Sequence, residues 1–206
     1  MPIKVILFDA DGVIQYAPED WSVAFARLLP FENSQRAHKF TADIFAAETA
    51  FLSRTDGFDQ ALDDVLKAWR LIDYKSSVVE TMFSLLAFDD VMEVVQATRS
   101  KGIQCFLASN QQKRRAAHMS DKFSYSSKFD GELYSCNLGA AKPSALYFER
   151  ALEAAGVDAA STLFVDDRAE NIAGVSRLGL HTMLYDGRNG AANLLSGLHR
   201  FGIGIS

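Results

Sequence analysis

The chain has few cysteines, no excess of positive charge and no long apolar segment. Only two of its 206 residues are cysteines, Cys105 and Cys136, which cannot form a disulfide framework. The formal net charge is -5, and the one basic cluster is the short run Lys113-Arg114-Arg115, which argues against nucleic acid as a partner. No apolar run is long enough to span a membrane, and the N-terminus leads into an expected strand without a signal peptide. We therefore expect a soluble cytoplasmic protein with reduced thiols, either a monomer or a homodimer.

The chain does contain enough apolar residues for a sizeable core. Hydrophobic residues make up 49% of it, and the length fits one α/β domain or a small core domain with an insertion. Short apolar runs predict strands over residues 3–8, 103–108, 131–135, 162–165 and 181–184. Helical patterns lie between them, over residues 91–99, 111–119, 145–155, 169–178 and 194–198. This alternation predicts a parallel sheet with right-handed crossovers.

The segment between the first and second strands has a different character. From residue 15 to residue 88 we expect helices and no strand, the last helix covering residues 78–86. One helix face is indicated by the spacing of Phe40, Ile44, Ala47 and Phe51. Four such helices can pack as a bundle. We therefore assign residues 1–14 and 89–206 to an α/β core and residues 15–88 to an inserted helical cap, placed to act as a lid.

The first expected strand ends in two carboxylates, Asp9 and Asp11, followed by Gly12. In parallel α/β sheets, ligands lie outside the carboxyl ends of the strands. Two close carboxylates repel each other, so either a hard cation lies between them or one of them is protonated. Both arrangements suit phosphoryl chemistry, although Asp-x-Asp-Gly is also common in turns.

Polar residues follow two further expected strands and one loop. Ser109 and Asn110 end one strand, Asp166 and Asp167 end another, and Lys142 precedes a helix that starts with proline. Each alone could be a helix cap or a surface residue. Together they predict one site, in which Ser109 and Lys142 bind phosphoryl oxygens and the four aspartates hold Mg²⁺.

The four segments that contain these residues resemble the four motifs of the haloacid dehalogenase superfamily, and the match extends over nearly the whole chain. The segments are Asp9-Ala10-Asp11-Gly12-Val13, Ser109 in Phe106-Leu107-Ala108-Ser109-Asn110, Lys142-Pro143, and Phe164-Val165-Asp166-Asp167 with Asn171. The inserted helices are similar to the type C1 cap of its subfamily I. The run Asn110-Gln111-Gln112-Lys113-Arg114-Arg115 resembles a branch that contains sugar-phosphate phosphatases.

The resemblance implies a Rossmann-like core, a phosphoaspartyl intermediate and Mg²⁺. It makes Asp9 the nucleophile and Asp11 the general acid and then base. It implies that Mg²⁺ is bound by Asp167, the Asp9 carboxylate and the Asp11 backbone carbonyl, with Asp166 in or near the ligand shell. Substrate phosphate would be bound by Gly12, Ser109, Asn110 and Lys142. Because the fourth motif has Asp-Asp where Gly-Asp is common, the division of roles between Asp166 and Asp167 stays open.

The sequence thus predicts a magnesium-dependent phosphatase that acts on a small phosphorylated metabolite, with sugar phosphates the first choice. A 2-haloacid dehalogenase would need neither Asp11 nor the Asp166-Asp167 pair, whereas a phosphomutase of the same fold stays possible. A receiver domain would lack the insertion and would carry its phosphorylated aspartate on a central strand rather than the N-terminal one. A catalytically silent scaffold would have no need for so many charged residues.

Overall fold

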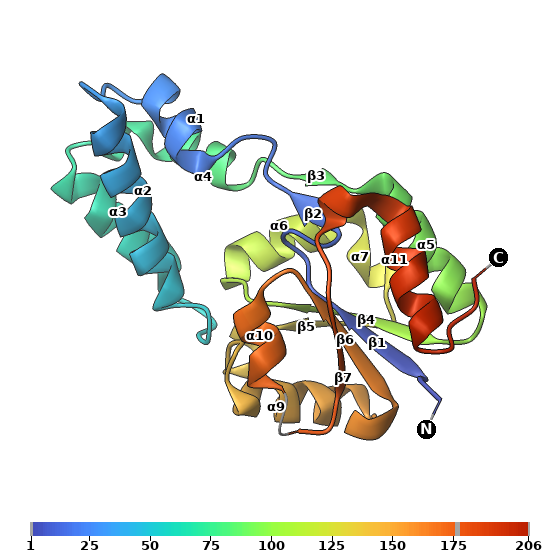
Figure 1. Cartoon of the computed structure of the whole chain (residues 1–206). Helices are drawn as coiled ribbons and strands as arrows, with labels where there is room; N and C mark the ends of the chain where they lie inside the picture. The colour runs from blue at the N-terminus through green and yellow to red at the C-terminus, as the bar shows by residue number, and fades with distance from the viewer. Residues whose placement is uncertain (1, 176–177, 206) are drawn as a thin grey trace.

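The computed structural model describes residues 2–175 and 178–205 and contains one five-stranded parallel sheet with the order β5-β4-β1-β6-β7 (Figure 1). Its strands are β1 (Val5–Phe8), β4 (Gln104–Ser109), β5 (Gly131–Tyr134), β6 (Thr162–Asp166) and β7 (His181–Leu184). All five agree with the ranges expected from the sequence. The predicted Rossmann-like core with an inserted helical bundle is therefore confirmed. No helix in the described residues is both long and apolar enough to cross a membrane.

Helices cover both faces of the sheet. They are α5 (Asp89–Ser100), α6 (Lys113–Phe123), α7 (Tyr125–Lys128), α8 (Ser135–Leu138), α9 (Ala145–Ala155), α10 (Ala169–Gly174) and α11 (Gly190–Arg200). Short 3₁₀ turns lie at Ala159–Ser161 and Gly187–Asn189 in the core and at Ile72–Tyr74 in the insertion. One apolar cluster joins the sheet to α5, α6, α7 and α11, and a second joins its other face to α9 and α10. The helix expected over residues 169–178 ends at Gly174, and residues 176–177 lie outside the described part of the chain.

Strand β1 lies at the centre of the sheet, which explains its unbroken apolar sequence. Ile6 and Phe8 belong to one apolar cluster and Val5 and Leu7 to the other, so every side chain of the strand is buried. β1 is thus both the N-terminal and the central strand. Strand position therefore does not separate this fold from a receiver domain, contrary to our expectation, and only the insertion does.

The insertion contains four α-helices with an apolar cluster of their own. They are α1 (Trp21–Leu28), α2 (Ser34–Thr49), α3 (Phe58–Ala68) and α4 (Lys75–Met82). The Asp20 side chain caps α1 by accepting hydrogen bonds from the backbone of Ser22 and Val23. Phe40 and Ile44 are fully buried on the expected face of α2, whereas Phe51 lies beyond the end of that helix. Because the bundle has its own core, we call it the cap.

Two short strands connect the cap to the core, and the expectation that residues 15–88 contain no strand was wrong. β2 (Gln15–Tyr16) and β3 (Leu86–Ala87) pair antiparallel where the chain leaves the core and returns to it. The helix expected over residues 78–86 instead ends at Met82. Strands of two residues are too short to show an alternating apolar pattern, so the sequence contained no signal for them.

Candidate active site

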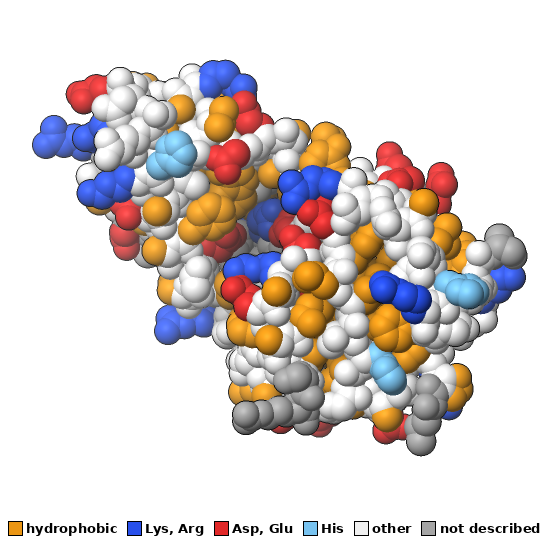
Figure 2. Space-filling view, in the orientation of Figure 1, with side chains coloured by type: hydrophobic (Ala, Val, Ile, Leu, Met, Phe, Trp, Pro, Cys, Tyr) orange, Lys and Arg blue, Asp and Glu red, His pale blue; other side chains and the backbone are white. Residues whose placement is uncertain are grey.

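The carboxyl ends of three adjacent strands form the floor of a cleft. Phe8 at the end of β1 is paired with Leu107 of β4 and Val165 of β6, so the residues that follow these positions lie side by side. The cleft has a volume of about 310 Å³ and is lined by Asp9, Asp11, Gly12, Ser109, Asn110, Lys142, Asp167, Arg168 and Asn171. The predicted site residues therefore lie together, with Asp166 behind the lining and paired with Lys142. Figure 2 shows the hollow between the cap and the core.

Lys142 is the buried cation of the cleft. Its Nζ lies 2.7 Å from Asp9 Oδ1 and 2.7 Å from Asp166 Oδ2, and it donates to the Ala108 carbonyl at 2.9 Å. Three acceptors thus match the three donors of the ammonium group. Burial lowers the pKa of Lys142, but the two carboxylates outweigh this effect and raise it overall. Lys142 consequently keeps its charge and fixes the orientation of Asp9.

Both carboxylate oxygens of Asp166 are already used by the protein. Besides Lys142, Asp166 accepts two hydrogen bonds from Asn171 Nδ2, both 3.0 Å long, and one from the backbone N–H of Arg168 at 2.8 Å. The side chain has no exposed area. Asp166 therefore holds Lys142 and the start of α10 in place.

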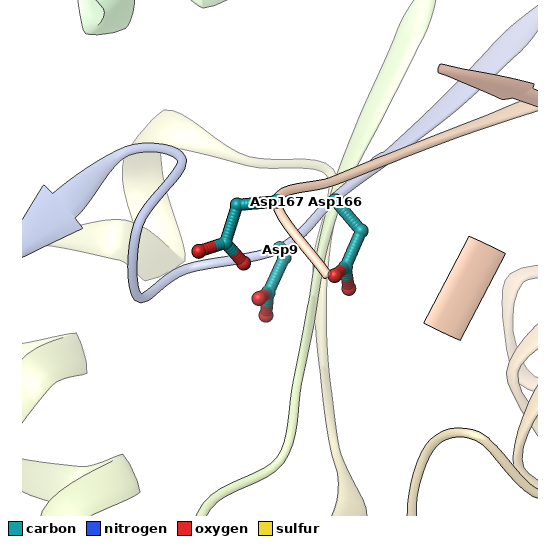
Figure 3. Close-up of side chains that lie close together, drawn as sticks. All are labelled: Asp9, Asp166 and Asp167. Carbon is teal, nitrogen blue, oxygen red and sulfur yellow. The ribbon is translucent and has the colours of Figure 1, made fainter. Parts of the chain in front are cut away.

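Asp9, Asp166 and Asp167 form a cluster suited to a metal ion (Figure 3). One carboxylate oxygen from each lies within 4.8 Å of the others. Asp167 Oδ1 is buried and has no hydrogen-bond partner within residues 2–175 and 178–205. A buried carboxylate oxygen without a partner is costly, and Mg²⁺ prefers such oxygen ligands. The residues present therefore fit Mg²⁺, with Asp167 as the ligand that has a free oxygen.

Gly12 provides the space in which Asp167 lies. Its φ is +85°, and a Cβ at this position would lie 2.2 Å from Asp167 Oδ2. Any other residue would displace the carboxylate as well as strain the backbone. Gly12, which we expected to bind substrate, thus has a clear role beside the metal cluster.

We expect Mg²⁺ affinity to fall as the pH is lowered from 8 to 6. Burial raises the pKa of Asp9 to about 7, with Asp166 adding to the rise and Lys142 opposing it. Burial and the charge of Asp166 raise the pKa of Asp167 to about 6. Protonated carboxyls do not bind Mg²⁺, so each displaced proton weakens binding by about tenfold per pH unit below its pKa. Calorimetric titrations in buffers of different ionisation enthalpy measure the Mg²⁺ affinity and the number of protons released on binding. An affinity that does not change with pH, with no proton release, would contradict this expectation.

The side chain of Asp11 is directed toward α6 rather than into the metal cluster. Its two oxygens accept hydrogen bonds from Arg115 Nη1 at 2.7 Å and Nη2 at 3.0 Å. Gln15 donates to Oδ1 at 2.9 Å, and Gln111 donates to Oδ2 at 2.6 Å. Burial acts to raise the pKa of Asp11, but the charge of Arg115 and these hydrogen bonds hold it below its usual value.

Ser109 and Asn110 lie at the end of β4, on the other side of β1 from Asp166 and Asp167. Asn110 exchanges two 2.8 Å hydrogen bonds with the backbone of Lys142, which joins the end of β4 to the lysine loop. The hydroxyl of Ser109 is buried and accepts a 3.3 Å hydrogen bond from Gln111. From the sequence, Gln111 and Arg115 were noted only within the run from Asn110 to Arg115, and no role was predicted for them or for Gln15. The sequence gives no signal of the direction in which a long polar side chain points.

Comparison with known proteins gives the same family as the motifs. Residues 3–179 match the model of the haloacid dehalogenase-like hydrolases. A predicted HAD-like hydrolase from Porphyromonas gingivalis is 20% identical with a TM-score of 0.71, covering 97% of this chain and 98% of its own. A HAD family enzyme from Bacteroides thetaiotaomicron, in complex with magnesium and inorganic phosphate, is 20% identical with a TM-score of 0.71, covering 93% and 98%.

A third similar structure is named for a specific activity. L-2-haloacid dehalogenase from Xanthobacter autotrophicus is 18% identical with a TM-score of 0.64, covering 87% of this chain and 76% of its own. At these identities the similar structures establish the fold alone, whereas the family model spans most of the chain. The chain belongs to the haloacid dehalogenase-like hydrolase family.

Proposed function

We propose that this protein is a magnesium-dependent phosphatase of small phosphomonoesters, with sugar phosphates the first choice. The observation that carries the proposal is the free, buried oxygen of Asp167 beside Asp9 and Asp166. A phosphate carries negative charge, and these carboxylates would repel it without a bound cation. A displacement at carbon by Asp9 would have no use for such a cluster.

Asp9 is the proposed nucleophile. Its carboxylate attacks phosphorus, the bond from phosphorus to the leaving oxygen breaks, and an aspartyl phosphate forms. Lys142, 2.7 Å from Asp9 Oδ1, holds the attacking group and favours its ionised form. When bound, Mg²⁺ supplies positive charge that neutralises the attacking carboxylate and the phosphoryl oxygens.

Asp11 is the proposed acid in the first step and the base in the second. Its proton passes to the leaving oxygen, and the resulting carboxylate then takes a proton from the water that hydrolyses the aspartyl phosphate. Arg115 lowers the pKa of Asp11 in the structure. The negative charge of a bound phosphate acts in the opposite direction and favours uptake of the proton.

The substrate class is inferred from the cleft and the cap. A cleft of about 310 Å³, lined by core residues and with the helical cap beside it, suits a small metabolite better than a phosphoprotein or an oligonucleotide. The net charge of -5 also disfavours nucleic acid. The magnesium and phosphate complex of the Bacteroides thetaiotaomicron enzyme supports phosphate chemistry on this fold.

Haloacid dehalogenation is the second candidate, because one similar structure is an L-2-haloacid dehalogenase. One panel separates the alternatives: sugar phosphates, nitrophenyl phosphate, a phosphopeptide, an oligonucleotide and L-2-chloropropionate, each with Mg²⁺ and with excess chelator. We expect magnesium-dependent phosphate release, fastest from a sugar phosphate. Chloride release that resists chelator would establish the dehalogenase instead. An isomerised sugar phosphate without free phosphate would indicate a mutase, and a faster reaction on the phosphopeptide or oligonucleotide would refute the small-substrate assignment.

A further inference from the structure

Arg115 of α6 bonds Asp11 and the cap at the same time. Its Nη1 and Nη2 donate to the two oxygens of Asp11, and its Nε donates to the carbonyl of Met82 at 3.2 Å. Met82 is the last residue of α4, and the guanidinium also lies 5.8 Å from the ring centroid of Trp21 in α1. Arg115 is only 6% exposed. One buried side chain therefore connects the loop that carries Asp11 to two helices of the cap.

The hydrogen bonds on Asp11 leave its carboxylate with a single orientation. A carboxylate has about four acceptor positions, and Asp11 receives two donors on each oxygen. Two of the four come from the rigid fork of Arg115, which is the strongest geometry for such a pair. Arg115 Nη1 also donates to Gln111 Oε1 at 2.7 Å, which orients the amide of Gln111 toward Asp11. Arg115 thus fixes Asp11 both directly and through Gln111.

Three neighbours of Arg115 on α6 also bind the insertion, two of them at the segment that follows Met82. His118 Nε2 lies 3.0 Å from the carbonyl of Phe83, and Lys122 donates to the carbonyl of Leu85 at 2.8 Å. Arg114 forms an ion pair with Asp59 of α3 at 2.6 Å. The segment that returns from the cap to the core is therefore bound along α6. A movement of α4 against α6 would move the Met82 carbonyl to which Arg115 is bonded.

We propose that Arg115 is a positioning residue for Asp11 and makes the orientation of Asp11 depend on the seating of the cap. The proposal rests on the phosphatase function proposed above. To give its proton to the leaving oxygen as the bond to phosphorus breaks, Asp11 must exchange one present partner for the substrate. Of the two neutral donors, Gln111 is held by Arg115 through its Oε1, so Gln15, on the strand leading into the cap, is the partner that gives way. The charged fork of Arg115 keeps the carboxylate in place during that exchange.

The test compares two esters and three variants. Arg115→Met removes the fork and keeps an unbranched side chain, Arg115→Lys keeps the charge without the fork, and Arg114→Met is the matched control. Arg114 is the adjacent residue and also binds the cap, but through Asp59. A sugar alkoxide needs a proton to leave, whereas nitrophenolate needs it less. We expect Arg115→Met to lose about 100-fold in kcat on the sugar phosphate, much less on nitrophenyl phosphate, with KM little changed.

We expect Arg115→Lys to recover part of that loss, and Arg114→Met to affect both esters alike. An equal loss of activity on both esters in Arg115→Met, or the same selective loss in Arg114→Met, would overturn the proposal. A crystal structure of Arg115→Met decides the question independently of activity: the Asp11 carboxylate should turn away from its present orientation, and an unmoved carboxylate would contradict the proposal. If the wild type hydrolyses neither ester, the proposed function fails while the crystal structure still tests Arg115. If Arg115→Met does not fold, Arg115→Lys serves in both measurements.

Discussion

Asp9→Asn is expected to abolish turnover of every phosphomonoester while leaving the fold intact. An amide is nearly isosteric with the carboxylate but is a poor nucleophile, so no aspartyl phosphate forms. Removal of a covalent nucleophile costs on the order of a million-fold in kcat. Lys142 keeps its 2.7 Å partner Asp166 in this variant, so the buried cation stays paired. Steady-state assays of phosphate release measure the loss, and thermal melting checks the fold.

Two controls make the Asp9→Asn result decisive. Intact mass detects deamidation of the introduced amide, which would regenerate the carboxylate and a false activity. Acid quenching of the wild type during turnover should trap a phosphorylated protein, and the variant should yield none. Full activity in a folded and undeamidated Asp9→Asn protein would remove Asp9 from the nucleophile role.

Asp167→Asn is expected to weaken metal binding mainly, and Asp166→Asn to lower stability mainly. Asp167 has the free oxygen, so its loss should weaken Mg²⁺ binding by about 100-fold or more, by comparison with the 10–100-fold typical of residues that only support a ligand. Because burial raises the pKa of the Asp167 carboxyl to about 6, a neutral amide there should not lower the melting temperature. Calorimetric titration with Mg²⁺ and thermal melting in chelator measure the two effects.

Asp166→Asn should mainly destabilise the fold. Asp166 is fully buried and accepts hydrogen bonds from Lys142, Asn171 and the backbone N–H of Arg168. Lys142 keeps Asp9 as a partner in this variant, so the expected cost is that of lost hydrogen bonds to a charged group, about 1.5–3 kcal/mol in the free energy of unfolding. Its Mg²⁺ affinity should fall less than that of Asp167→Asn. The opposite order of Mg²⁺ affinities would exchange the roles of the two aspartates, which the Asp-Asp sequence alone left open.

The parts of the site that follow strands could be predicted from the sequence. Val5–Phe8 is apolar at every position because both sides of β1 are covered, and such a run is visible without a structure. Once β1, β4 and β6 are parallel neighbours, their carboxyl ends must meet at one edge. The positions of Asp9, Ser109 and Asp166 therefore follow from strand assignment alone.

The parts that depend on side-chain direction could not be predicted. Lys113-Arg114-Arg115 reads as a short basic cluster, yet Arg115 is buried against Asp11 while Arg114 reaches outward to Asp59. Neighbouring helical residues point about 100° apart, and only the position of the cap decides which of them is covered. The pairing of β2 with β3 likewise arises from the return of the chain at residue 86 and not from local propensity.

The central position of β1 has a consequence for synthesis of the chain on the ribosome. Its two neighbours, β4 and β6, begin at Gln104 and Thr162, so the second of them emerges more than 150 residues after β1. At about 5–20 residues per second, β1 waits roughly 8 to 30 s for its last partner. The cap, with an apolar cluster of its own, can fold during this interval. Until β4 emerges Val5–Phe8 stays unpaired, and the charges of Lys4 and Asp9 on either side discourage its association with other nascent chains.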